Sequence, residues 1–192
     1  MTEIFIKKIK NRIAQTAVVN STIRNMHSAP ALAPIRIKLN NLDIEKLIKN
    51  IYIKDNYTLY LDELTHDFKK NIPFKNDGWG PSRKCLNLFI RDLFYNSFIR
   101  EYYNLPSNFD LYNAFLRPLE LPLDSYVAKN IIAYNLKDNS KKINLPRWNS
   151  VISLKQIDSK AYQNKAIEIA KLENCIPIHL DLIFWKPSKI LT

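Results

Sequence analysis

The sequence predicts an all-α protein, a compact helical bundle built as one domain. Apolar residues recur at helical spacing along most of the 192-residue chain, and runs of valine and isoleucine typical of strands are scarce. Hydrophobic residues make up 46% of the chain, which is enough to bury a full core. A chain of this length has room for one domain of ordinary size, so we expect residues 1–192 to fold as a single domain.

The N-terminal part divides into a long or broken helix over 3–26, a loop over 27–34, a short helix over 44–51 and a helix over 57–71. Prolines and small residues favour the loop. Asp43 is a good N-cap residue for the short helix. Pro73 predicts the end of the helix over 57–71, because the residue before a proline is driven away from helical geometry.

The C-terminal part contains predicted helices over 81–103, 110–116, 125–136, 159–172 and 177–185, with an exposed connection over 137–156. Pro81 suits the first turn of a helix, where its missing N–H costs nothing. Ser107 or Asn108 can cap the second of these helices, and Asp124 stands at the N-cap position of the third.

The composition excludes several kinds of chemistry. The two cysteines and three histidines are scattered without the spacing of a zinc site, and an iron–sulfur cluster would need four thiolates. We therefore expect no cofactor, no metal ion and no metal cluster. Chemistry, if there is any, must come from lysine, aspartate, glutamate, tyrosine or serine.

Charge and hydropathy indicate which kinds of partner and which cellular compartment to expect for the protein. The formal charge of +11 favours an anionic partner such as nucleic acid, although lysine and asparagine are abundant throughout and charge alone is a weak indicator. We find no stretch that could span a membrane and no secretory signal, so we expect no membrane contact. We expect a cytoplasmic monomer with reduced cysteines.

Both glycines of the chain lie in one stretch, Asn76-Asp77-Gly78-Trp79-Gly80-Pro81-Ser82-Arg83-Lys84. A chain this poor in glycine should use it where φ is positive or where a partner approaches the backbone closely. The stretch leads into the N-terminus of a predicted helix, where N–H groups and the helix dipole favour a phosphate. An ordinary tight linker between two helices is the alternative, and the glycines alone do not decide between them.

This stretch resembles the hairpin of the helix-hairpin-helix DNA glycosylases, a resemblance carried by Gly78-Trp79-Gly80. Bifunctional members of that superfamily have a lysine beside the hairpin and an aspartate at the start of a later helix. Lys84 and Asp124 stand in those places, and Asp124 lies in a Leu-Pro-Leu-Asp run that resembles the superfamily's segment. The resemblance implies a helix-hairpin-helix motif over about 76–84.

A second match concerns the damaged base. Asp181 and Trp185 lie four residues apart near the C-terminus, which is similar to the pair that reads the flipped base in the archaeal GO glycosylases. That family removes 8-oxoguanine and also cleaves the strand. Asp77 departs from the proline often found before the first glycine, and the N-terminal third has no firm match. Because of these departures, the resemblance implies the class of reaction more firmly than the identity of the base that is removed.

The resemblance implies a mechanism on damaged double-stranded DNA. The nucleotide is flipped out of the helix, Trp185 stacks on the base, and Asp181 accepts hydrogen bonds from its edge. The neutral amine of Lys84 attacks C1′ and forms a Schiff base, while Asp124 stabilises the charge that develops as the base leaves. The residues expected to contact the DNA backbone are Gly78, Trp79, Gly80 and Arg83.

Other interpretations stay open. Lys84 could be a solvated phosphate-binding lysine, Asp124 only an N-cap, and Trp185 part of the core. The chain would then be a non-catalytic helix-hairpin-helix DNA-binding module. A glycosylase without lyase activity would need Asp124 but not Lys84. An unrelated helical interaction protein or toxin-like factor would show no affinity for DNA at moderate salt.

Overall fold

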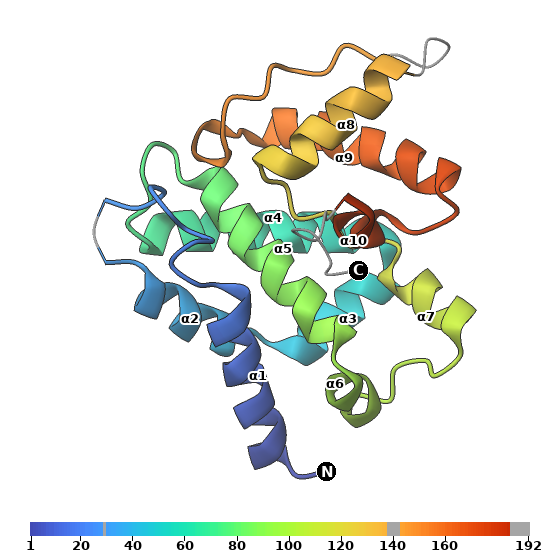
Figure 1. Cartoon of the computed structure of the whole chain (residues 1–192). Coiled ribbons are helices and arrows are strands. Elements are labelled where there is room, and N and C mark those ends of the chain that lie inside the picture. Colours follow the sequence, from blue (N-terminus) through green and yellow to red (C-terminus); the bar gives the residue numbers. More distant parts are fainter. Residues whose placement is uncertain (29, 138–142, 185–192) are drawn as a thin grey trace, which may run out of the picture.

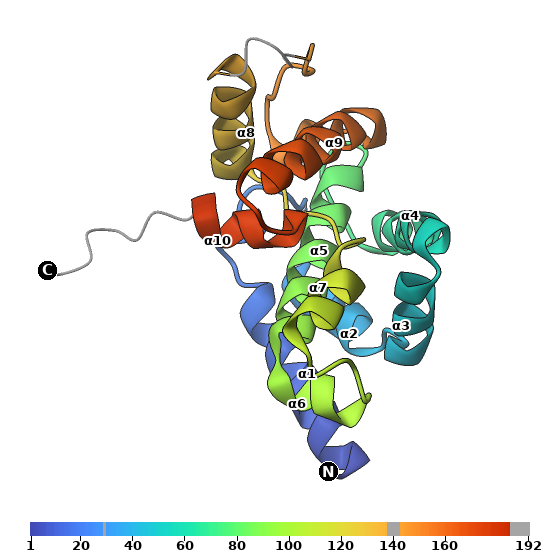
Figure 2. The ribbon, with the colours of Figure 1, turned by 90° about the vertical axis from the view of Figure 1, so that its right-hand side faces the viewer.

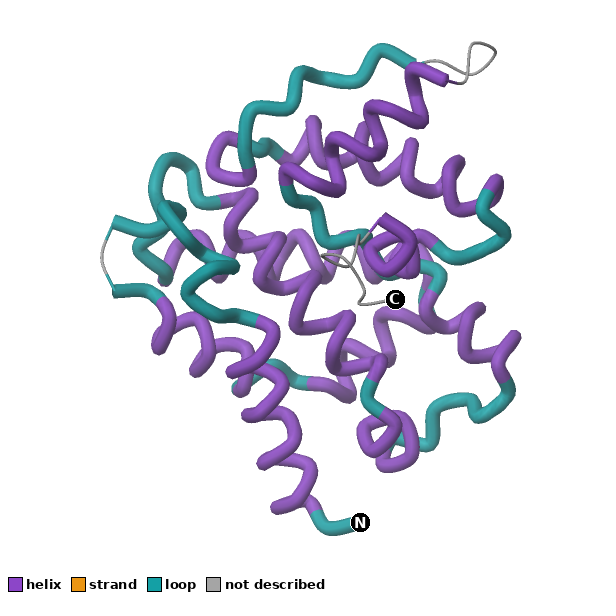
Figure 3. The backbone as a smooth tube through the Cα atoms, in the orientation of Figure 1, coloured by secondary structure: helices purple, strands orange, loops and turns teal. Residues whose placement is uncertain are grey.

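Helices form the whole architecture, which confirms the predicted all-α class. The computed structural model describes residues 1–28, 30–137 and 143–184, and within these ranges it contains helices but no strand (Figure 3). The elements are α1 (Glu3–Ala17), α2 (Leu32–Asn40), α3 (Ile44–Tyr52), α4 (Lys54–Asn71), α5 (Trp79–Tyr95), α6 (Ser97–Tyr102), α7 (Phe109–Leu116), α8 (Ser125–Lys137), the 3-10 helix η1 (Val151–Ser153), α9 (Gln156–Leu172), the 3-10 helix η2 (Pro177–His179) and α10 (Leu180–Phe184).

Helix α5 is the central element. It packs against α1, α2, α4 and α6, and its N-terminal turn packs against η1 (Figures 1 and 2). One apolar cluster fills the space among α1–α7 and includes Leu86 and Phe89 of α5. A second cluster lies among α8, α9 and α10, and Trp79 joins it from the first turn of α5. The two cores therefore meet at the N-terminal end of α5.

The predicted helix over 3–26 ends much earlier, at Ala17. Val18 takes an extended conformation, and the side chain of Thr22 accepts a hydrogen bond from the N–H of Val19. β-Branched residues pack poorly in a helix, and a short hydroxyl side chain offers the backbone an alternative partner. The chain therefore leaves α1 as an irregular segment over 18–28 that crosses in front of α5 (Figure 1).

Two further elements differ from the prediction. Helix α2 was not predicted, and it begins inside the predicted loop, since Pro34 falls in its first turn, where proline is tolerated. The long helix expected over 81–103 is interrupted at Asn96, whose side chain accepts hydrogen bonds from the N–H groups of Phe98 and Ile99. An N-cap inside a helical pattern ends one helix and starts the next.

Candidate functional site

Lys84 lies on the one partly exposed stripe of α5. The helix begins at Trp79, two residues before the predicted start, so Lys84 stands in its second turn. The helix dipole acts mainly within the first turn, so Lys84 lies beyond its strongest field. Lys84 Nζ lies 3.4 Å from the carbonyl oxygen of Thr22 in the segment after α1. The amine is thus turned toward the side of α5 that this segment covers.

Asp124 caps α8, as the sequence predicts. Its Oδ1 accepts hydrogen bonds from the N–H groups of Tyr126 at 2.8 Å and Val127 at 2.9 Å. The preceding link is held by α9, because the side-chain amide of Gln163 bonds both the N–H and the carbonyl of the buried Leu121. The carboxylate is therefore fixed in direction and partly open to solvent.

Lys84 and Asp124 face the same side of α5. Lys84 and Arg91 are seven residues apart, which places them two helical turns apart on one face. Arg91 forms an ion pair with Asp181 of α10, and the charge of Asp124 acts on Asp181. Figures 1 and 2 agree that α8, α10 and the segment after α1 all lie on this side. Within the described ranges, no hydrogen bond or ion pair joins Lys84 to Asp124.

The predicted base-binding pair is only partly described. Asp181 is bound by Arg91, which also pairs with Asp92 at 2.7 Å, so its carboxylate is not the free acceptor that base recognition requires. Burial raises the pKa of Asp181, the guanidinium of Arg91 opposes this, and the charge of Asp124 raises the pKa further. Trp185 lies outside the described residues.

Within the glycine stretch, residues 78–83 are buried, whereas Asn76 and Asp77 are exposed. Gly78 has a φ of +72° and precedes α5, so the turn does require a glycine. A Cβ on Gly80 would stand 2.0 Å from the carbonyl oxygen of Val151 in η1. Trp79 is 3% exposed. The close approach that glycine permits is therefore made by η1 of the same chain, and Trp79 and Gly80 are not placed to contact DNA.

Arg83, predicted as a DNA contact, is also buried, so its guanidinium is not exposed to a phosphate in this structure. Its side chain is 4% exposed and forms an ion pair with Asp62 of α4. Its Nε lies 3.5 Å from Glu120, and its guanidinium stacks 4.8 Å from the centre of the Trp79 ring. Burial lowers the pKa of Arg83, and Glu120 opposes this. Such a guanidinium is a structural tie between helices.

Sequence reasoning missed the partners of this arginine. Asp62 also accepts a hydrogen bond from Gln156 at the start of α9, and Glu120 accepts one from Asn87 at 3.0 Å. The cluster thus joins α4, α5, α9 and the link that carries Asp124. A single buried carboxylate in an amphipathic helix gives no signal in the sequence, because exposed carboxylates occur at the same spacing.

Asp124 can be tested first as a cap. Replacing Asp124 with alanine removes the acceptor of two N–H groups and is expected to lower the free energy of unfolding by about 1 kcal/mol. Asp124→Asn keeps an acceptor at the cap and should cost much less. Urea unfolding followed by circular dichroism measures both. Equal losses for the two variants would contradict the capping role.

Comparisons with known proteins found no relative of this chain. The chain matched no protein-family model, no curated protein and no solved structure. None of the described helices is both long enough and apolar enough to cross a membrane. Among the described residues, no three His, Cys, Asp or Glu side chains are grouped as a metal ion would need.

Proposed function

We propose that the protein is a DNA glycosylase with lyase activity, in which Lys84 is the nucleophile and Asp124 its carboxylate partner. The support for this proposal is a chain of contacts: Lys84 Nζ lies near the carbonyl of Thr22, Arg91 two turns along the same face of α5 pairs with Asp181, and the charge of Asp124 acts on Asp181. The hydrogen bond of Lys84 is to a backbone carbonyl, and among the described residues no carboxylate lies within ion-pair distance of its amine.

The proposed reaction has two stages. The neutral amine of Lys84 attacks C1′ of a flipped nucleotide, and the glycosidic bond breaks with its electron pair leaving on the base. Asp124, held by two N–H groups, faces the positive charge that develops on the sugar. Loss of a proton from nitrogen leaves an aminal at C1′. The nitrogen lone pair then expels O4′, which takes up a proton, so that the sugar ring opens and a protonated imine (the Schiff base) forms. Removal of a C2′ proton then expels the 3′ phosphate and cleaves the strand.

DNA contacts in this proposal come from groups around Lys84 and not from the buried hairpin. Arg147 is exposed, and its neighbour Trp148 donates a hydrogen bond from Nε1 to Ser125 Oγ at 3.3 Å. The backbone at Arg147 therefore lies near the start of α8. Arg24 is exposed in the segment that bonds Lys84. These cations could bind phosphates on either side of a flipped nucleotide.

A non-catalytic DNA-binding module is the second candidate. Two observations favour it: Lys84 and Asp124 are not bonded to one another, and capping alone accounts for the two hydrogen bonds of Asp124. Such a module would bind DNA through the same cations. It would tolerate the loss of Lys84 or Asp124 without losing an activity.

An excision assay separates the candidates. The protein is incubated with duplexes that carry 8-oxoguanine or uracil, and base release and strand cleavage are measured separately. We expect release from at least one duplex, with Asp124→Asn reducing the rate by about 10²-fold while leaving the fold unchanged. DNA binding without release from any duplex would contradict the proposal and favour the binding module. No DNA affinity at moderate salt would contradict both.

A further inference from the structure

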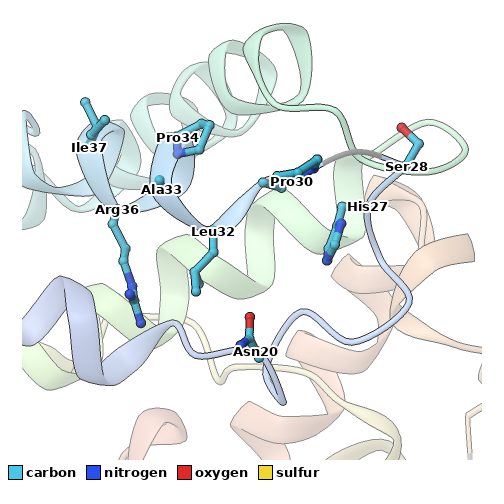
Figure 4. Close-up of a pocket in the computed structure, with 10 residues that line it drawn as sticks. Asn20, His27, Ser28, Pro30, Leu32, Ala33, Pro34, Arg36 and Ile37 are labelled. Carbon is cyan, nitrogen blue, oxygen red and sulfur yellow. The ribbon is translucent and has the colours of Figure 1, made fainter.

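A hollow of about 830 Å³ lies between the segment after α1 and α2. Asn20 and His27 line it from the segment, and Leu32 and Arg36 line it from α2 (Figure 4). None of its lining residues is among the proposed catalytic or base-binding residues. Its volume lies within the range of small-molecule sites, which is roughly 300–1,000 Å³.

Hydrogen bonds fix both walls of this hollow. Arg36 donates from Nε to the carbonyl of Val18 at 3.0 Å and from Nη2 to the carbonyl of Gln15 at 2.9 Å, which ties α2 to the end of α1. On the other side, His27 pairs with Phe74 in an isolated antiparallel bridge. The hollow is therefore formed before any ligand arrives.

The residues that line the hollow favour a ligand that has a flat ring and an anionic group. The lining contains no acidic residue, and within the described ranges no carboxylate lies at ion-pair distance from Arg36. Because the acceptors of Arg36 are neutral carbonyls, its positive charge is not neutralised. Pro30 and Leu32 provide apolar surface. Asn20 offers both a donor and an acceptor, which suits the polar edge of a heterocyclic base.

We propose that this hollow binds a mononucleotide unit, with the base against Leu32 and Pro30 and the phosphate toward Arg36. Either a free nucleotide or the terminal nucleotide of a DNA strand could supply this chemistry. The inference goes beyond the proposed glycosylase activity, because it requires neither Lys84 nor Asp124.

The test is calorimetric titration of the whole chain with deoxynucleoside 5′-monophosphates. Ala33 lines the hollow and is exposed at the start of α2, so Ala33→Trp should fill the space without disturbing the core. We expect this variant to lower the affinity by at least roughly tenfold. Ala133→Trp makes the same change at an exposed position of α8, outside the hollow, and should leave the affinity within about twofold.

Three further titrations identify the ligand. Nucleosides without phosphate and inorganic phosphate alone should each bind more weakly than the nucleotide, because each fills one half of the hollow. A short single strand with a 5′ phosphate that binds more tightly than the free nucleotide would identify a strand end as the source, and the reverse order would identify the free nucleotide. Equal binding to wild type and Ala33→Trp, or no binding, would overturn the inference. Excision activity is measured separately, so either proposal can fail alone.

Discussion

Arg83→Met is expected to lower the free energy of unfolding by about 3–5 kcal/mol. The side chains of Arg83 and Asp62 are only 4% and 15% exposed. Removing the guanidinium leaves the carboxylate of Asp62 in a poorly solvated place with one hydrogen bond, from Gln156. Glu120 loses its nearby positive charge in the same step. Chemical denaturation followed by circular dichroism measures the loss.

The matched control is Lys38→Met, which removes a cation from a more exposed pair. The side chains of Lys38 and Asp67 are 25% and 54% exposed, and such pairs contribute at most about 1 kcal/mol. A loss for Arg83→Met no larger than the loss for Lys38→Met would show that Arg83 is not the buried tie described above. Arg83 would then be free to act as a DNA contact, as the sequence had suggested.

Gly80→Ala is expected to destabilise the protein by about 3 kcal/mol, although alanine is the better helix former. The added Cβ would meet the carbonyl oxygen of Val151 at 2.0 Å and the Cβ of Leu154 at 2.9 Å. Both belong to the chain around η1, so this part must move away from α5. For a protein of this size, each kcal/mol lowers the melting temperature by about 2–4 °C. A thermal melt therefore detects the change.

Ser82→Ala is the control on the same helix. Ser82 is fully buried, and its hydroxyl has no hydrogen-bond partner within the described part of the chain. Removing it should change the free energy of unfolding by less than about 1 kcal/mol. A melting temperature for Gly80→Ala equal to that of Ser82→Ala would contradict the close contact between α5 and η1.

The fold class was predictable because amphipathic spacing is a local property. The cap at Asp124 was predictable for the same reason, since a short acidic side chain before a helical pattern has few other uses. Helix α2 was missed because Pro34 was taken as part of a loop, whereas proline is acceptable in a first turn. The end of α1 at Ala17 depends on weak preferences that the sequence shows only in part.

The sequence predicts the helices that carry the candidate site but not the contacts between them. The need for glycine was visible in the sequence, but the partner that approaches Gly80 could not be known, because η1 lies far along the chain. The same limit applies to Arg83: a cation in a first turn can face a phosphate or a buried carboxylate. Lys84 and Asp124 are forty residues apart, and what connects their surroundings is the ion pair between Arg91 of α5 and Asp181 of α10, which the sequence does not reveal.

The most direct test of the central claim is borohydride trapping of a Schiff base on Lys84. Wild type, Lys84→Gln and Lys129→Gln are incubated with duplexes that carry 8-oxoguanine, uracil or an abasic site, and borohydride is added. Lys129 is an exposed lysine of α8 and serves as the matched control. We predict a covalent protein–DNA band for wild type and Lys129→Gln, and none for Lys84→Gln. A band that persists in Lys84→Gln, or the absence of a band for wild type on every duplex, would contradict Lys84 as the nucleophile.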